Sequence, residues 1–356
     1  ITDPEITVFY PDTNSFVNTA EIKYSLSEYI SEGTITYQRI GGNADLGSPH
    51  VIKIEEESLA SSGLHDSLGF SNLPQLQDGS TYRITYAGTD RAGNEAIPIS
   101  IENISYDITA PIISNLSPLD SVAVNHTRFS YNLNEALVEG SIRWINSGGK
   151  EDGNSPHTVS LLPEMMSIGN SGEINLETPP PLIDGGEYII EIFGSDIAGN
   201  NTDTVRISSI TYDVTSPKYL VTYPTTDIYV PDSRLSFRLS ENLSKGVISW
   251  IYTGGNDDTR SPHEISLNNE ELLSEPFDGY LMNQPTLVDG ASYRITFNGE
   301  DPAGNQVDEV FLEDVKVDFS PPILTVSSPL SGAAIKEPNI SYSISEDLKD
   351  GTMFWS

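Results

Sequence analysis

The sequence predicts an all-β chain of tandem Greek-key β-sandwich domains, and three observations support this fold class. The same group of motifs returns about every hundred residues along the 356-residue chain. Short segments alternate apolar and polar residues, as strands with one buried face do. Aromatic residues recur at fixed places in these segments, where they would fill the space between two sheets.

The most regular motif is Asp-x-Ala-Gly-Asn, which occurs at residues 90–94, 196–200 and 301–305. The same interval of 105 or 106 residues separates the segments YDITAP, YDVTSP and VDFSPP. Three further sets recur in register: LSEYISEG, LNEALVEG, LSENLSKG and ISEDLKDG; GSPH, NSPH and RSPH; QDGSTY, IDGGEY and VDGASY. Coincident periods of this kind are the sequence signature of a tandem array.

The repeat boundaries are expected just after the aspartates of the YDITAP-type segments, which we call linker aspartates. We place full repeats at 1–108, 109–214 and 215–319, and an incomplete fourth repeat at 320–356. Three short strands without their partners, as expected in 320–356, would not be stable alone. The first residue is isoleucine rather than methionine, so we expect the sequence to be part of a larger protein.

Within one repeat the expected elements are strands, as residues 20–28 (AEIKYSLSE), 33–40 (GTITYQRI) and 81–90 (TYRITYAGTD) show by their alternation. Residues 55–63 (EEESLASSG) are expected to form one or two helical turns between strands. The Gly-Gly pairs are interpreted as turns, because no Lys-Ser/Thr and no helix follows them, as a phosphate loop would need. These pairs lie at 41–42, 148–149 and 254–255.

Two sets of aromatic residues are expected to pack in the cores. One set falls in the third strand of each repeat. The other follows an Asp-Gly pair by three residues, as in a tyrosine corner, where the hydroxyl bonds to upstream backbone. The first set is Tyr37, Trp144, Trp250 and Trp355, and the second is Tyr82, Tyr188 and Tyr293.

On these motifs the chain resembles the bacterial Ig-like tandem repeats of large surface adhesins and other exported multidomain proteins. The resemblance rests on YRITYAGTDRAGN, YIIEIFGSDIAGN and YRITFNGEDPAGN, and it covers the three full repeats and the start of the fourth. It implies Ig-like sandwiches in a linear rod at the cell surface or elsewhere outside the cell. It also implies calcium, which stiffens the junctions between domains in several such arrays. The cadherin linker pattern Asp-x-Asn-Asp-Asn is missing, so that family is not implied.

The composition excludes several classes of partner and chemistry. The chain has 52 acidic and 18 basic residues, a formal net charge of -34, whereas nucleic-acid binding needs a basic face that displaces counterions. No apolar run approaches the roughly 20 residues that cross a bilayer, so we expect no direct membrane insertion in this segment. The lack of cysteine excludes disulfides, thiolate catalysis and cysteine-ligated zinc.

Recurring acidic residues predict calcium (Ca²⁺) at the junctions between repeats. The loops between the second and third and between the sixth and seventh strands lie at the end of such a sandwich nearest the preceding domain. Carboxylates that converge there would repel one another unless a cation lay between them, and backbone carbonyls with Asn200 or Asn305 would complete a shell of about six to eight oxygens. The candidate ligands are Asp107, Glu135 and Asp196; Asp213, Glu241 and Asp301; Asp318 and Glu346; and, in the first repeat, Glu28 and Asp90.

The same acids have simpler alternative explanations. An aspartate that accepts backbone N–H bonds and a left-handed glycine account for Asp-x-Ala-Gly-Asn as a turn. The net acidity alone would keep a long extracellular protein soluble. The joint recurrence of a linker aspartate and a loop glutamate favours calcium, because a turn requires neither.

Two more recurring positions precede and follow the Ser-Pro pairs. The acidic one is interpreted as a turn residue, with the alternative that it reaches the following junction. The histidine has no second ligand at a fixed short spacing, so we expect it to bond to a neighbouring loop rather than to a metal. The aspartates are Asp45, Asp152 and Asp258, and the histidines are His50, His157 and His263.

These features favour a non-enzymatic stalk or spacer of a large extracellular surface protein, with neighbouring repeats of the same chain as its partners. The alternative is an adhesive or glycan-binding module that contacts other cell-surface proteins or glycans. We expect no catalytic site, because the polar residues that recur do so in every repeat, as scaffold residues would. The alternative would use exposed aromatics, for which the candidates are Tyr10, Tyr219, Tyr223 and Tyr252.

Overall fold

The structure is a computed structural model that describes residues 2–55 and 57–354. Its elements are almost all β-strands, which confirms the predicted fold class. The chain forms two compact units, Ile1–Tyr212 and Asp213–Ser356, and each is described by itself. No helix among the described residues is long and apolar enough to cross a membrane. Trp355 lies outside the described residues.

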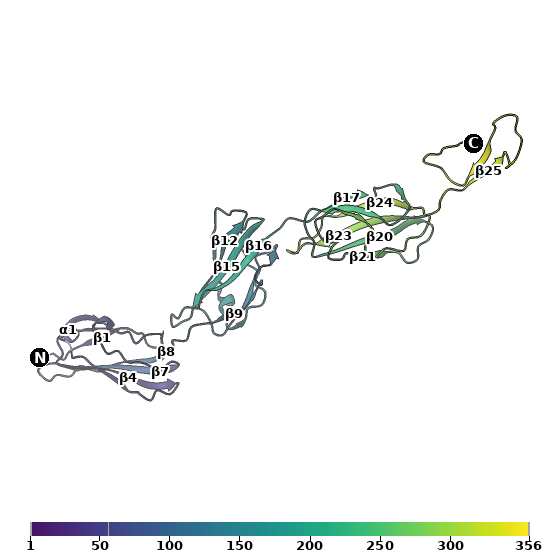
Figure 1. Cartoon of the computed structure of the whole chain (residues 1–356). Coiled ribbons are helices and arrows are strands. Elements are labelled where there is room, and N and C mark those ends of the chain that lie inside the picture. The colour runs from purple at the N-terminus through teal and green to yellow at the C-terminus, as the bar shows by residue number, and fades with distance from the viewer. Residues whose placement is uncertain (1, 56, 355–356) are drawn as a thin grey trace. The chain divides into compact units, whose positions relative to one another are not determined.

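The first repeat consists of a three-stranded and a five-stranded sheet, ordered β1-β3-β6 and β2-β8-β7-β4-β5. The short strand β2 pairs parallel with β8, and the other pairs are antiparallel. Figure 1 shows β1 and α1 on one side of this repeat and β4 and β7 on the other. The elements are β1 Ile6–Tyr10, β2 Phe16–Val17, β3 Lys23–Leu26, β4 Glu32–Gly42, β5 His50–Lys53, α1 Glu57–Ala60, β6 Gly63–Asp66, the 3-10 turn Ser67–Gly69, β7 Ser80–Thr89 and β8 Ile99–Tyr106.

The second repeat has the same two sheets, ordered β14-β11-β9 and β10-β16-β15-β12-β13. A 3-10 turn at Pro163–Met166 takes the place of the helical turn α1. The elements are β9 Ile113–Ser117, β10 Ala123–Val124, β11 Ser130–Leu133, β12 Glu139–Gly149, β13 His157–Ser160, β14 Gly169–Asn170, β15 Gly186–Ser195 and β16 Val205–Tyr212.

The second unit begins with the third repeat, whose sheets are ordered β17-β19-β22 and β18-β24-β23-β20-β21. Its elements are β17 Tyr219–Tyr223, β18 Ile228–Val230, β19 Leu235–Leu239, β20 Lys245–Gly255, β21 His263–Ser266, β22 Phe277–Gly279, β23 Ala291–Glu300 and β24 Val310–Val317.

The described part of residues 320–356 forms one hairpin, β25 Leu324–Ser328 with β26 Ser341–Ile344. Two of the three expected strands are therefore present, and the third, which would contain Trp355, reaches outside the described residues. Leu324 and Tyr342, whose counterparts Ile113 and Tyr131 are buried in the second repeat, are about half exposed, at 57% and 50%. The five-stranded sheet that covers the corresponding strands of the full repeats has no counterpart among the described residues of this segment.

Three hydrophobic cores fill the sandwiches, and each draws its residues from one of the three full repeats. The alternation of β7 is typical: Tyr82, Ile84 and Tyr86 are buried between the sheets, while the residues between them face outward. Strands with this period of two form because one face gains apolar burial and the other stays hydrated. The expected core aromatics are confirmed within the described residues: Tyr37, Trp144, Trp250, Tyr82, Tyr188 and Tyr293 are at most 2% exposed.

Candidate metal centres at the linker aspartates

The segment that enters the second repeat is held close to that repeat's loops. Asp107 directly follows β8, and its N–H donates to the carbonyl of Val17. Its own carboxylate accepts the N–H of Thr109 at 3.0 Å. Ile112 N–H then donates to Asn134 Oδ1, in the loop that also carries Glu135. The chain therefore delivers the linker aspartate to the loop between β11 and β12.

The Asp-x-Ala-Gly-Asn motif brings a second acid to the same place. Asp196 is 3% exposed and accepts the N–H of Asn200 on Oδ1 at 2.8 Å. Gly199 adopts φ +91°, a left-handed conformation that glycine takes without steric cost. The motif is therefore the turn that the sequence predicts, and its aspartate is fixed at the end of β15.

The asparagine of the motif connects the turn to the linker. Asn200 Nδ2 donates to the carbonyl oxygen of Asp107 at 2.9 Å and to Asp196 Oδ2 at 2.9 Å. Both partners are acceptors, so the amide nitrogen, not the amide oxygen, must face them. Asn200 Nδ2 thus holds the linker backbone, and the expectation that the amide oxygen helps to complete a calcium shell stays a prediction.

Three carboxylates meet where the linker joins this turn. One oxygen each from Asp107, Glu135 and Asp196 lies within 4.8 Å of the other two. Asp196 is buried and the other two are half-buried. Within the part of the chain that the structure describes, Glu135 Oε1 is buried and has no hydrogen-bond partner.

The pKa of Glu135 reflects this crowding of carboxylates. Burial raises the pKa of its carboxyl, and the negative charges of Asp107, Asp196 and Asp78 raise it further. A cluster of hard carboxylate oxygens, one of them buried without a donor, fits a calcium ion, which takes oxygen ligands in flexible geometry. The donor set contains no nitrogen or sulfur, so it does not favour zinc.

The third repeat repeats the arrangement. Asp213, Glu241 and Asp301 each place one oxygen within 4.8 Å of the others. Asn305 Nδ2 donates to the carbonyl of Asp213 at 2.9 Å and to Asp301 Oδ2 at 2.8 Å. Two sites with the same geometry thus occur at equivalent points of different repeats.

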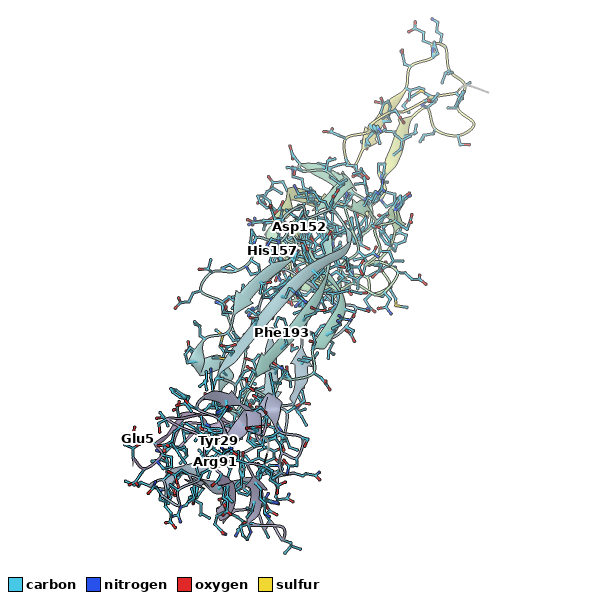
Figure 2. All side chains as sticks on the ribbon, turned by 90° about the vertical axis from the view of Figure 1, so that its left-hand side faces the viewer. Glu5, Tyr29, Arg91, Asp152, His157 and Phe193 are labelled. Atoms are coloured by element: carbon cyan, nitrogen blue, oxygen red, sulfur yellow. The ribbon has the colours of Figure 1, made fainter. Side chains whose placement is uncertain are left out.

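The remaining predicted ligands are not brought into such groups within the described residues. In the first repeat, Asp90 accepts two bonds from Asn94, and Glu28 accepts the hydroxyl of Thr2. Arg91, next to Asp90, places its guanidinium 4.4 Å from the ring centre of Tyr29, and Figure 2 labels this pair. At the start of residues 320–356, Asp318 accepts Ser320 N–H, and Glu346 follows β26.

The recurring histidines and the recurring loop aspartates turn out to be partners. His157 Nε2 lies 2.6 Å from Asp152 Oδ2, and the hydroxyl of Tyr188 donates to the same oxygen at 2.8 Å. Asp152 and His157 are labelled in Figure 2. Asp152 Oδ1 accepts the N–H of Asn154. The tyrosine hydroxyl also accepts the N–H of Ile183, which is the expected tyrosine-corner bond.

The same network occurs in the other two full repeats, with distances of 2.6–2.7 Å between the aspartate and its histidine and tyrosine. Its aspartate does more than form a turn, because one carboxylate oxygen contacts both the histidine and the tyrosine. Sequence reasoning found all three residue types but not their contact, because the tyrosine is more than 30 residues from the aspartate in the chain. The members are Asp45, His50 and Tyr82; Asp152, His157 and Tyr188; Asp258, His263 and Tyr293.

The four aromatic candidates for a glycan surface differ in exposure, and one of them is buried. Tyr219 is 4% exposed and packs against Phe237 and Phe297, so its assignment as exposed is wrong. It occupies the first core position of β17, where Ile113 lies in β9. Tyr10 is 37% exposed, and Tyr223 and Tyr252 are half-buried.

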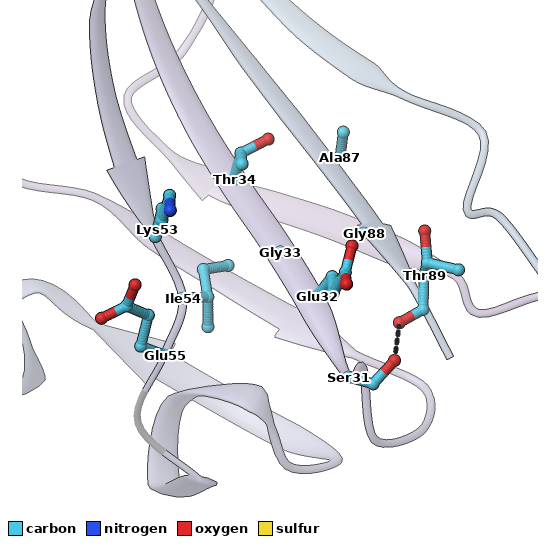
Figure 3. Close-up of a pocket in the computed structure, with 10 residues that line it drawn as sticks. All are labelled: Ser31, Glu32, Gly33, Thr34, Lys53, Ile54, Glu55, Ala87, Gly88 and Thr89. Carbon is cyan, nitrogen blue, oxygen red and sulfur yellow. Dashed lines mark hydrogen bonds between the residues drawn. The ribbon is translucent and has the colours of Figure 1, made fainter. Parts of the chain in front are cut away.

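A groove of about 590 Å³ lies on the five-stranded sheet of the first repeat, where Gly33 pairs with Gly88 (Figure 3). Its charged side chains are Glu32, Lys53 and Glu55, and none of its ten lining residues is aromatic. Ser31 closes one end by donating its hydroxyl to the carbonyl of Thr89. The groove thus offers neither a stacking surface nor a histidine for catalysis.

Comparisons with known proteins give distant likenesses in structure only. The FN1-FN3 domains of chicken CNTN1 match with 14% identity over 89% of this chain and 98% of that chain, at a TM-score of 0.30. Fibronectin(III)-like modules of Clostridium thermocellum CbhA match with 10% identity over 58% of this chain and 94% of that chain, at 0.29. Dimeric latent PorU from Porphyromonas gingivalis matches with 11% identity over 89% of this chain and 34% of that chain, at 0.22. No family model and no curated protein matches the chain.

Proposed function

We propose that this chain is a non-enzymatic structural segment, a stalk or spacer, of a large extracellular surface protein, and that calcium ions at its linker aspartates stiffen the junctions between repeats. The observation that carries the proposal is the pair of three-carboxylate groups, each formed by a linker aspartate, a loop glutamate and a turn aspartate. The linker thus supplies one ligand and the following repeat the other two.

Repetition separates this arrangement from chance acidity. The two groups use equivalent residues of different repeats, and in each the motif asparagine holds the linker carbonyl. Glu135 contributes a buried oxygen with no hydrogen-bond donor among the described residues, which is costly unless a cation approaches it. A bound calcium ion would offset the repulsion between the carboxylates and fix the linker against the repeat.

The test is thermal unfolding of the full chain in chelator, in excess calcium and in excess magnesium. Binding to the folded state alone stabilises it by about 2.7 kcal/mol at a hundredfold excess over the Kd. For a domain of about a hundred residues this corresponds to a rise in Tm on the order of 10 °C. We expect calcium to give that rise in the second and third repeats and magnesium to give much less, because magnesium loses its water shell reluctantly.

Three variants make the test specific. Asp107→Asn keeps an oxygen for Thr109 N–H but removes a charged ligand, so the calcium-dependent rise of the second repeat should vanish. Glu135→Gln should also abolish it, and in chelator should raise Tm by about 3 °C because it removes repulsion between like charges. Asp120→Asn is the matched control, since Asp120 also accepts one backbone N–H, from Ser208, but belongs to neither group. A calcium response that magnesium reproduces, or that survives in Asp107→Asn, would contradict the proposal.

A further inference from the structure

A second recurring aspartate, in the repeat that precedes the linker, accepts hydrogen bonds from the linker. Asp78 lies in the turn before β7. Its Oδ1 accepts the N–H of Ile108 at 2.8 Å, and its Oδ2 accepts the hydroxyl of Thr109 at 2.8 Å. Both carboxylate oxygens are therefore used by two consecutive residues of the linker.

The same pair of hydrogen bonds occurs at the end of the third repeat. Asp289 accepts the N–H of Phe319 at 2.6 Å and the hydroxyl of Ser320 at 2.9 Å. The two linkers differ in the side chain at the middle position, which is isoleucine or phenylalanine. The aspartate makes no hydrogen bond to that side chain. They share the backbone N–H and the hydroxyl that the carboxylate recognises.

The aspartate sits on a fixed support. The carbonyl of Asp78 accepts Asn43 Nδ2 at 2.8 Å, and the preceding residue, Gln77, donates its N–H to the tyrosine-corner hydroxyl of Tyr82 at 2.9 Å. That hydroxyl donates to Asp45, which also holds His50. The Asp-His-Tyr network therefore supports the turn that carries Asp78, and we assign to it a role in positioning the Asp78 carboxylate.

The linker itself is shaped to fit. Asp107 Oδ1 accepts Thr109 N–H at 3.0 Å, and Asp318 Oδ1 accepts Ser320 N–H at 3.2 Å, so each linker folds into a tight turn. This turn points the N–H of its middle residue, Ile108 or Phe319, and the hydroxyl of the Ser/Thr towards the aspartate of the preceding repeat. On the other side, Asn200 holds the Asp107 carbonyl.

We infer that the half-buried carboxylates of Asp78 and Asp289 are docking sites for the linker sequence Asp-x-Ser/Thr of the same chain, and that this latch orders the linker without an ion. Calcium then binds to a linker that is already in place. This goes beyond the proposed function, because the latch operates whether or not calcium binds. It also assigns a purpose to the hydroxyl two residues after the linker aspartates Asp107 and Asp318, in Thr109 and Ser320.

The test is residue-resolved amide hydrogen exchange of the full chain in chelator. A hydrogen bond to a charged acceptor should slow exchange of the Ile108 and Phe319 amides by roughly ten- to a hundredfold relative to an unstructured chain. Asp78→Ala should abolish the protection of Ile108 and leave that of Phe319. Asp289→Ala should do the reverse, so that each variant controls for the other.

Further variants separate the hydrogen bond from the charge and from folding. Asp78→Asn keeps an acceptor oxygen and should retain most of the protection. Asp66→Ala removes a carboxylate of the same repeat that accepts Leu68 N–H, and should leave Ile108 protected. Exchange of the strand amides of β7 reports whether Asp78→Ala still folds.

Two results would overturn the latch. One is an Ile108 amide that is unprotected in chelator and protected only with calcium, which would mean that the ion alone orders the linker. The other is protection that persists in a folded Asp78→Ala chain. A chain that shows no calcium response but keeps a chelator-resistant, Asp78-dependent protection would contradict the proposed calcium sites and leave the latch standing.

Discussion

A single carboxylate in each full repeat is the centre of a fully satisfied buried network. Asp258 Oδ1 accepts a backbone N–H from Arg260, and Oδ2 accepts the hydroxyl of Tyr293 and contacts His263 at 2.6 Å. Burial alone would raise the pKa of Asp258, but the hydrogen bonds from Tyr293, His263 and Arg260 outweigh it and lower the pKa to about 2. Buried polar groups of this kind stabilise only while every partner is present.

This lowered pKa predicts how the effect of Asp258→Asn on Tm depends on pH. A carboxyl whose pKa is lower in the folded than in the unfolded state stabilises the fold above its unfolded pKa, near 4, and loses that contribution as the pH falls towards about 2. The variant should therefore have a lower Tm than the natural chain at pH 7, and the difference should shrink between pH 4 and 2. Thermal unfolding at several pH values measures it.

The neighbouring residue provides the matched control for that measurement. Asp257 is exposed, so Asp257→Asn should leave Tm unchanged across the same range. A Tm difference between Asp258→Asn and the natural chain that stays constant down to pH 2 would show that the charge of Asp258 does not stabilise the fold.

At the same scale, the sequence revealed residue types better than contacts. Recurrence in register identified Asp107, Glu135 and Asp196, and the expected sandwich topology placed them together. It did not reveal that Asp78 grips the linker, because an Asp-Gly pair before a strand is already explained as a turn. The signal that points to Asp78 is the hydroxyl that recurs in each linker, which a turn does not require.

Among the elements, the long strands β4, β12 and β20 all end at a Gly-Gly pair whose two members have different roles. Gly255 has φ +79°, and a Cβ there would lie 2.2 Å from the carbonyl oxygen of Gly290. At Gly254 a Cβ would meet nothing within 4 Å. The prediction of a turn is wrong, because both glycines lie in β20 and pair with β23 just after a register shift, and only the second glycine is required by the geometry.

This difference predicts unequal effects of alanine. Gly255→Ala should destabilise the third repeat by about 3 kcal/mol or more, because it combines a left-handed backbone with a clash against a paired strand. Gly254→Ala should change the free energy of unfolding by less than about 1 kcal/mol. Calorimetric unfolding of the full chain compares them, and equal effects would contradict this account of the Gly-Gly pair.

The strands themselves were the most predictable elements, because the period of two in segments such as 81–90 directly reflects which side chains are buried. The short strand β2 and its counterparts β10 and β18 were not predicted. They have two or three residues and pair parallel with the last strand of the repeat, so no alternation marks them. The burial of Tyr219 was also missed, since a lone tyrosine near a strand start shows no preference for either face.

Across the whole molecule, the carboxylates behind the net charge of -34 have different surroundings. Some carboxylates are stabilised in their charged form by hydrogen bonds inside single repeats, as in the Asp-His-Tyr networks, and some accept hydrogen bonds from the linkers. Among the described residues, two groups of three carboxylates come together around Asp107 and Asp213. An acidic chain of this kind depends on cations most where its carboxylates are closest.

The most direct measurement of the central claim is the stoichiometry of calcium binding to the full chain by isothermal titration calorimetry. The two three-carboxylate groups predict two ions per chain, with Kd values of about 10⁻⁴ to 10⁻³ M, typical of extracellular sites. Asp107→Asn and Asp213→Asn should each remove one ion, and the double variant should remove both. The absence of saturable binding in this range, or a stoichiometry that neither substitution changes, would contradict the assignment of calcium to the linker aspartates.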